Sequence, residues 1–204
     1  KYRLVVSPAV IDCLNDPAME TPKPGDPGLS KSSFALISTP AEALRAAASY
    51  AEKEGIMAVV LGDDIEGEAR VVAQDHARQA LQLAQQSGNE HRVLISGGET
   101  TVALKGTGRG GRNAEYLLSL VIELDGHPGI WALACDTDGI DGSEDNAGAI
   151  LRPDTLARAK NLGLDAVAML ANNDAYGFFD ALGDLVITGP TQTNVNDFRA
   201  ILIA

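Results

Sequence analysis

Two apolar runs, Met57-Ala58-Val59-Val60-Leu61 and Arg92-Val93-Leu94-Ile95-Ser96, flank an amphipathic stretch at residues 66–86. Within that stretch apolar residues recur at spacings of three and four, which is typical of a helix packed on one side. Upstream lie an apolar segment at residues 34–37, which we predict to be a strand, and a predicted helix from Pro40 to about Glu54. Strands that alternate with helices predict an α/β fold with helices on both faces of the sheet.

The alternation continues to the end of the chain. After the strand at 92–96 we expect a Gly97-Gly98 turn and a short strand at 101–105. The later pattern predicts a helix at 113–123, a strand at 130–135, short helices between 153 and 182, and strands at 185–188 and 200–203. We therefore predict an α/β three-layer sandwich with a mixed, mostly parallel sheet, in which some antiparallel strands lie near the edge.

The first 33 residues differ in composition from the rest. They open with a strand-like run at residues 2–6, and residues 16–33 carry prolines and glycines at a density that excludes a helix or a central strand. We interpret 1–33 as an amino-terminal strand and linking segment, and 34–204 as the α/β domain.

The bulk composition excludes several classes of protein. A formal net charge of −12 argues against a nucleic-acid partner, because phosphate polymers are bound by clusters of Lys and Arg. We find no apolar run of the roughly 20 residues that span a bilayer and no signal-peptide pattern, and we expect a cytoplasmic protein. Two cysteines, Cys13 and Cys135, are too few for a disulfide framework and are expected to be structural.

Two loops of the chain carry opposite charge, one basic and one acidic. Residues 105–112 carry four glycines and the cations Lys105, Arg109 and Arg112 without an acid. Such a loop can bring backbone N–H groups and guanidinium groups close to an oxyanion, and the start of the following helix also favours negative charge. Residues 136–145 carry five acids without a cation, namely Asp136, Asp138, Asp141, Glu144 and Asp145. Carboxylates at this density need a cation, a hydrogen-bond network or open water.

In a parallel sheet, both loops would follow strands at their carboxyl ends, where open α/β sheets bind ligands. A phosphate site with Mg²⁺ would then explain both loops together, since phosphoryl transfer needs donors for phosphate oxygens, a metal, and a carboxylate that holds the metal or accepts a proton. The alternative is a plain glycine-rich turn beside a solvated acidic turn. Composition and spacing leave both explanations open.

One standard sequence motif offers an alternative to the phosphate and Mg²⁺ site, namely a dinucleotide-binding loop. Residues 106–111 satisfy the G-x-G-x-x-G dinucleotide pattern between a strand and a helix, although Asp125 at the acidic offset falls in a turn. We find no Walker-type phosphate loop, and residues 136–141 do not fit a calcium-binding loop, because Ile140 takes a ligand position. A single nearby cysteine argues against zinc.

Three further polar segments are candidates. Residues 97–101 form either a plain turn or a site that presents Glu99 and threonine hydroxyls to a ligand. Residues 172–174 either cap a helix that begins near Ala175 or serve function directly. Residues 188–197 are rich in amides and hydroxyls and could close over a ligand. His76 lies on the apolar face of its helix, which favours a packed histidine.

Taken together, these blocks resemble the glycerate kinase family, some of whose members are named hydroxypyruvate reductase, and in particular its carboxyl-terminal MOFRL domain. The resemblance runs through Ser96-Gly97-Gly98-Glu99-Thr100-Thr101, Gly108-Arg109-Gly110-Gly111-Arg112-Asn113 and Thr137-Asp138-Gly139-Ile140-Asp141-Gly142. It includes segments 20–26, 61–63, 66–69, 172–174, 188–191 and 193–197. Gln192 stands where the family usually has glycine.

The resemblance implies ATP-dependent phosphorylation of D-glycerate to 2-phosphoglycerate with Mg²⁺. It implies that Arg112 clamps a carboxylate or phosphate, and that Asp138 and Asp141 act as catalytic hydroxyl or metal partners, with Asp138 as the metal ligand. Further residues are expected to line the substrate and nucleotide site: Gly97, Gly98, Glu99, Thr100, Arg109, Asn113, Asn194, Asn196 and Asp197.

The family also has a preceding Rossmann-like domain, which supplies a lysine and part of the substrate pocket and which this sequence lacks. We therefore expect the chain alone to be inactive, and a homo-oligomer is an open possibility. An NAD(P)H-dependent hydroxypyruvate reductase and a non-catalytic ligand-binding domain are the alternatives.

Overall fold

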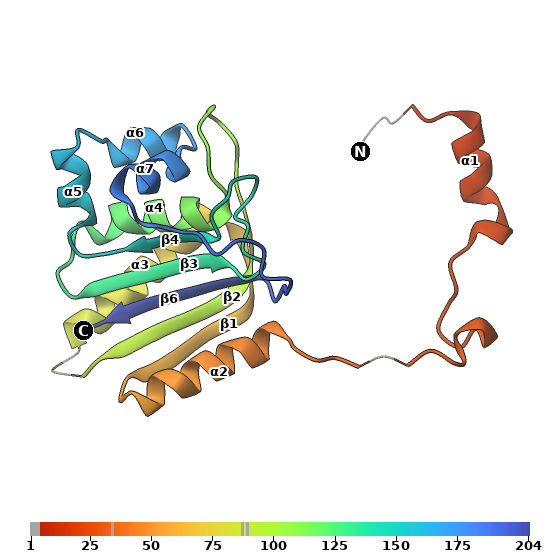
Figure 1. Ribbon diagram of the computed structural model, residues 1–204, viewed down its shortest axis with the longest axis horizontal. Coiled ribbons are helices and arrows are strands. Elements are labelled where there is room, and N and C mark those ends of the chain that lie inside the picture. The colour runs from red at the N-terminus through yellow and green to blue at the C-terminus, as the bar shows by residue number, and fades with distance from the viewer. Residues whose placement is uncertain (1–4, 34, 87, 89) are drawn as a thin grey trace. The chain divides into compact units, whose positions relative to one another are not determined.

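The computed structural model describes residues 5–33, 35–86, 88 and 90–204, and the chain divides into two compact units, Lys1–Ile37 and Ser38–Ala204. The first unit holds helix α1 (Pro8–Asn15) and two 3₁₀ turns, η1 (Pro17–Met19) and η2 (Pro27–Leu29) (Figure 1). Its described side chains are exposed. Of the strand predicted at 2–6, residues 2–4 lie outside the described residues, and Val5 and Val6 have no regular structure.

The second unit is built on a six-stranded sheet with the order β1-β2-β6-β3-β4-β5. Only β1 and β2 pair in parallel, whereas the other four neighbouring pairs are antiparallel. The strands are β1 (Met57–Glu68), β2 (Arg92–Thr101), β3 (Ile130–Asp136), β4 (Gly148–Leu151), β5 (Leu185–Val186) and β6 (Asp197–Ile203). The prediction of an α/β fold is confirmed, but the prediction of a mostly parallel sheet is wrong, because the last strand inserts between β2 and β3 in the opposite direction.

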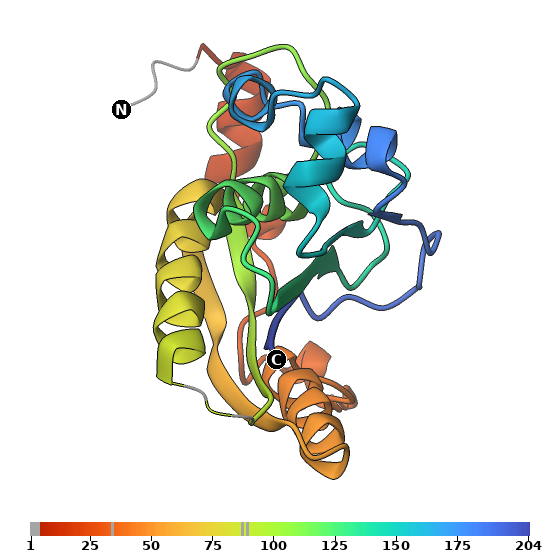
Figure 2. The ribbon, with the colours of Figure 1, turned by 90° about the vertical axis from the view of Figure 1, so that its left-hand side faces the viewer.

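Helices cover both faces of this sheet, as Figure 2 shows for α2 (Pro40–Lys53) and α3 (Ala69–Gln86). On the α3 face, α4 (Arg112–Leu124) fills the main core with fully buried leucines, each of which contributes roughly 2 kcal/mol by burial. Three short helices complete this layer: α5 (Thr155–Asn161), α6 (Ala166–Ala171) and α7 (Ala175–Leu182). None of the described helices is long and apolar enough to cross a membrane.

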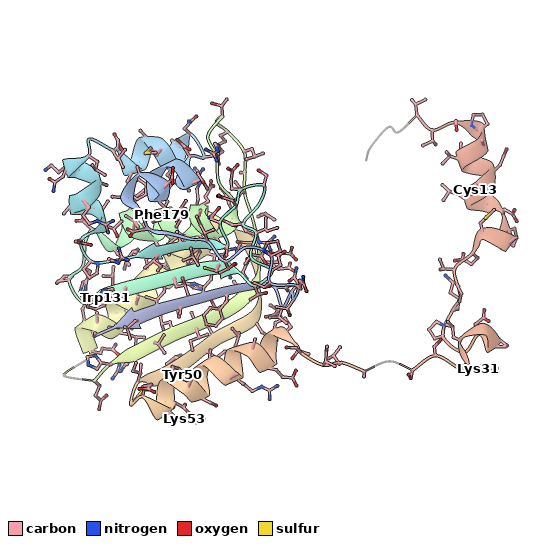
Figure 3. All side chains as sticks on the ribbon, viewed as in Figure 1. Cys13, Lys31, Tyr50, Lys53, Trp131 and Phe179 are labelled. Carbon is pink, nitrogen blue, oxygen red and sulfur yellow. The ribbon has the colours of Figure 1, made fainter. Side chains whose placement is uncertain are left out.

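The opposite face is covered over β1, β2 and β6, where Leu44 of α2 packs near Val93 and Ile95. Thr39 caps α2 by accepting a hydrogen bond from the amide of Glu42 at 3.2 Å, the first half of a capping box. Beyond α2, an open groove on this face is lined by Trp131, Leu133, Ile150 and Leu202. Figure 3 labels Trp131 on β3 and Phe179 among the helices of the other layer.

Two local predictions are wrong. Residues 35–37 have no regular structure, and Phe34 lies outside the described residues. Gly97 and Gly98 do not form a turn, because β2 runs on to Thr101 and no separate strand follows at 101–105. Gly98 has φ +116°, and a Cβ there would lie 2.3 Å from the backbone of Ile65, so glycine is required where the bulged β1 approaches β2.

The strand directions gather the polar loops at one rim. Since β2 and β3 are both antiparallel to β6, they point the same way as each other and as β1. The carboxyl ends of β2 and β3 and the start of β6 therefore meet, as Figure 1 shows. In the register, Asp197 stands opposite Gly98 on β2 and opposite Asp136 on β3.

Candidate functional site

Arg112, the first residue of α4, lies at the centre of this rim and contacts three carboxylates. Its Nε donates to Asp197 Oδ1 at 2.8 Å, its Nη2 to Asp136 Oδ2 at 2.7 Å, and its Nη1 to Glu99 Oε1 at 3.1 Å. The side chains of Asp197 and Asp136 are buried, whereas that of Glu99 is 61% exposed. The two buried acids hold the guanidinium in place, and the exposed contact with Glu99 is the one that an incoming oxyanion can replace.

Asp197 connects Arg112 to the interior of the domain. Its Oδ1 also accepts from Asn113 Nδ2 at 2.8 Å, and its Oδ2 accepts from the buried Arg199 and from the Thr100 amide at 3.4 Å. Asp197, Asn113 and Thr100 are all buried. These three predicted lining residues lie at the site. Their polar groups are hydrogen-bonded to one another and to Arg112, so they hold Arg112 in place.

Asp141 occupies the start of α4. Its carboxylate accepts from the amides of Asn113 at 2.9 Å and Ala114 at 2.8 Å, and the side chain is completely buried. Burial raises the pKa of Asp141 to about 6, although both amide hydrogen bonds favour the ionised form. The helix N-terminus that the sequence suggests for a ligand oxyanion is therefore filled by this chain's own carboxylate.

Asp138 is the more accessible of the two predicted catalytic acids. It is half-buried, its Oδ1 accepts from the Ile140 amide at 2.9 Å, and its Oδ2 has a long 3.5 Å contact with Asn194 Nδ2. The described residues contain no cluster of three His, Cys, Asp or Glu side chains that could hold a metal ion. Mg²⁺ often binds through one or two carboxylates together with substrate phosphates and water, so Asp138 fits a single-carboxylate ligand.

The segment 191–196 packs on the acidic loop and brings Asn194 and Asn196 beside it. The Thr191 amide donates to the Asp138 carbonyl at 2.9 Å, and the Thr137 hydroxyl donates to the Asn196 carbonyl at 2.7 Å. Asn196 and Gln192 adopt φ values of 65° and 61°. The two loops thus form one unit around Asp138.

The glycine-rich loop is held by the segment 172–174 rather than left open to a ligand. The five amides of residues 105–109 donate to Asn173 Oδ1 (twice), Asn172 Oδ1, the Asn172 carbonyl and Asp174 Oδ1, at 2.8 to 3.2 Å. A Cβ at Gly106 or Gly108 would lie 2.3 Å or 2.4 Å from residues 172–174. Of the two explanations left open for this loop, the closely packed glycine-rich turn fits these hydrogen bonds, because the chain itself takes the backbone amides. Asp174 makes no side-chain cap to α7.

Arg109 links the glycine-rich loop to the acidic loop. Its Nε donates to Glu144 at 2.9 Å, and its guanidinium carbon lies 4.2 Å from the centre of the Tyr176 ring. Tyr176 in turn donates its hydroxyl to Asp145 at 2.9 Å. The side chain of Arg109 is 60% exposed, so the ion pair is screened by water and contributes little stability.

Comparison with known proteins identifies the family. The model of the MOFRL family matches residues 92–197, which include Arg112, Asp138, Asp141 and Asp197. The chain belongs to the MOFRL family.

Its relatives carry two kinds of name. This chain is 50% identical to a protein of Agrobacterium vitis named "Putative hydroxypyruvate reductase". The match covers the whole of this chain and 53% of the length of that protein. The chain is 38% identical to the D-glycerate 2-kinase of Thermotoga maritima, over 90% of this chain and 44% of that protein. The crystal structure of glycerate kinase from Thermotoga maritima superposes with a TM-score of 0.80 at 37% identity, covering 84% of this chain and 42% of that one. The chain spans about half the length of these relatives.

Sequence reasoning missed two residues that organise the MOFRL site. Arg199 holds Asp197 from inside, and Glu115 accepts from Asn173 Nδ2 at 2.9 Å and from Arg70 Nε at 2.7 Å, which anchors the segment that holds the glycine-rich loop. The alternation of β6 was a usable signal for Arg199, because residues two apart on a strand share a face with Asp197.

Proposed function

We propose that this chain forms one wall of an ATP-dependent glycerate kinase site, at which the γ-phosphoryl group of ATP passes to D-glycerate and gives 2-phosphoglycerate. The observation that carries the proposal is Arg112, which is fixed by two buried carboxylates and directs its third contact to the exposed Glu99. The 38% identical D-glycerate 2-kinase of Thermotoga maritima supports this assignment.

The geometry of the rim supports the following roles. The guanidinium of Arg112 can exchange Glu99 for the substrate carboxylate or the transferring phosphate, since its planar fork matches either oxyanion. Asp138 would hold Mg²⁺, which neutralises charge on the phosphates when bound. Asn194 lies beside Asp138 and can orient the ligand, and the Asn196 backbone supports it by donating its amide to Asn194 Oδ1. Asp141 and Asp197 hold the site from its buried side.

We further propose that the rest of the natural protein, a preceding Rossmann-like domain, completes this site. Arg109 and Arg112 are both paired with acids of this chain, so on this proposal the preceding domain supplies further cations for the triphosphate. The relatives are about twice as long as this chain, which leaves room for such a domain. On this proposal the chain alone has no kinase activity.

A hydroxypyruvate reductase is the second candidate, because two relatives that are 50% identical carry that name. The glycine-rich loop argues against it. A dinucleotide pyrophosphate binds to the free amides of such a loop and to a helix N-terminus, but here segment 172–174 takes the amides of 105–109 and Asp141 takes the helix start.

One experiment separates the two candidates. The natural full-length protein is assayed for ADP release with D-glycerate and Mg-ATP, and in parallel for oxidation of NADH or NADPH with hydroxypyruvate. We expect glycerate-dependent ADP release and no nicotinamide oxidation. The reverse result would replace the kinase by the reductase.

A further inference from the structure

A buried chain of polar side chains runs inward from Arg112 through Asp197 to Arg199. Arg199 lies on β6 and is 1% exposed. Its Nη2 donates to Asp197 Oδ2 and to Thr100 Oγ1 at 3.2 Å, and its Nη1 donates to the Gly97 carbonyl at 3.3 Å. These contacts join β6 to β2 directly beneath the rim.

Stability alone does not explain an arginine at this position. Taking a guanidinium out of water costs several kcal/mol, and an apolar side chain of similar volume often stabilises a protein as well or better. Arg199 Nε also has no hydrogen-bond partner in the described part of the chain. The cation is therefore retained at a cost, and the group that it contacts most directly is Asp197.

The two oxygens of Asp197 face two different arginines. Oδ1 accepts from Arg112 Nε and Asn113 Nδ2, both at 2.8 Å, whereas Oδ2 accepts from Arg199 and from the Thr100 amide. With Oδ2 fixed from inside, the carboxylate is held against rotation, and Oδ1 together with Asp136 Oδ2 fixes where Arg112 lies.

We infer that Arg199 is a positioning residue, which locks the Asp197 carboxylate so that Arg112 presents its outer edge at the rim. This inference rests on the proposed function only for its kinetic consequence. The contacts that it describes belong to the chain itself.

Tyr116 and His76 complete the setting of Arg199. The guanidinium carbon of Arg199 lies 5.2 Å from the centre of the Tyr116 ring, whose face attracts a cation. The Tyr116 hydroxyl is 2.8 Å from His76 Nδ1. Burial and the nearby Arg199 lower the pKa of His76 to about 4, so that the ring is neutral at neutral pH and adds no second positive charge next to Arg199.

The test compares Arg199→Met with the conservative Arg199→Lys in the natural full-length protein. Arg158→Met is the matched control, because Asp184 is likewise buried and paired with two arginines, Arg152 and Arg158, outside the site. We expect Arg199→Met to lower kcat by about a hundredfold, because a displacement of about 1 Å of a catalytic group can cost this factor. Arg199→Lys should recover part of this loss, and Arg158→Met should leave kcat unchanged.

A double-mutant cycle tests whether Arg199 acts through Arg112. In an Arg112→Ala background, Arg199→Lys should change kcat by less than about twofold, since the group that it positions is already gone. Full additivity of the two effects would overturn the inference. So would wild-type kcat in both Arg199 variants.

A readout without turnover keeps this result separate from the kinase proposal. Hydrogen exchange of the Arg112 Nε–H, followed by NMR, should be faster in Arg199→Lys than in the wild type and unchanged in Arg158→Met. Unchanged exchange in Arg199→Lys would overturn the positioning role whatever the reaction is. Faster exchange in a protein that does not phosphorylate glycerate would keep the positioning role and remove the proposed function.

Discussion

The carboxylate of Asp141 accepts a 2.9 Å hydrogen bond from the backbone amide of Asn113 and thereby caps α4 from a loop 28 residues further along the chain. The cap also holds the acidic loop against the helix that carries Arg112. A Cβ at Gly111 would lie 2.3 Å from Asp141 Oδ1, so the glycine before Arg112 is needed for this approach. The hydrogen bonds of Asp141 therefore fix the acidic loop and Arg112 relative to each other.

Removing this cap should destabilise the fold. Asp141→Ala leaves two buried amides without an acceptor and is expected to lower the free energy of unfolding by about 2 kcal/mol. Urea denaturation followed by circular dichroism measures the change. The control is Asp165→Ala, which removes the exposed cap of α6 and should cost about 1 kcal/mol or less. Equal effects would contradict a special role for Asp141.

His76 gives a signed prediction for pH. Its folded pKa of about 4 lies below the ordinary value of 6.5, so the fold favours the neutral ring. The stability that it contributes is fully present above pH 6.5 and is lost as the pH falls towards 4, up to about 3 kcal/mol. NMR titration of the ring and the stability difference between wild type and His76→Gln across this range measure the effect. A ring that titrates near 6.5 would contradict the prediction.

The two neighbouring glycines of β2 should differ in tolerance. Gly98→Ala places a Cβ 2.3 Å from the backbone of Ile65 at a φ of +116°, and it should cost about 2 to 3 kcal/mol. Gly97→Ala meets its nearest atom, the Asp197 carbonyl oxygen, at 3.3 Å and should cost less than about 1 kcal/mol. Thermal unfolding of both variants checks the order, and the reverse order would refute the strand pairing at the bulge.

Asn173 should tolerate a carboxylate poorly. Asn173→Asp places an acid against the buried Glu115, where Nδ2 now donates at 2.9 Å, and should cost about 3 kcal/mol. Asn172→Asp is the control, because Asn172 is exposed and an aspartate keeps the acceptor for the Thr107 amide. Chemical denaturation compares the two, and similar stabilities would argue against the anchoring role of Asn173.

Much of the fold follows from local sequence patterns. The period of apolar residues locates α3 and α4, and the run from Ile130 ends in the acidic loop as β3 does. The position of β6 does not follow from these patterns. Strand order and direction are set by long-range pairing and packing in the folded sheet, and not by the pattern of the strand itself. The two loops that follow β2 and β3 nevertheless lie at one rim of the sheet, since β2 and β3 point the same way on either side of β6.

The sequence indicated which residues lie at the rim, but not which of them are accessible there and which are buried. Arg112 and Asp138 reach the rim with accessible groups, whereas Asp141, Asp197 and Thr100 are buried behind it. A sequence shows which residues are charged but not which are buried. Residues that position a ligand-binding side chain therefore cannot be told apart from residues that bind the ligand. The glycine pattern of 106–111 is likewise shared by loops that bind phosphate and loops that pack closely on another segment.

The most direct test of the role of Arg112 is the turnover of Arg112→Lys in the natural full-length protein, measured as glycerate-dependent ADP release. We predict a loss in kcat/KM of about a hundredfold or more, because lysine carries its charge on a single nitrogen and lacks the planar fork with which the guanidinium reaches two acids and an oxyanion. Circular dichroism should show an intact fold, and Arg109→Lys should retain more activity. Wild-type kcat/KM in Arg112→Lys would contradict the central role of this arginine.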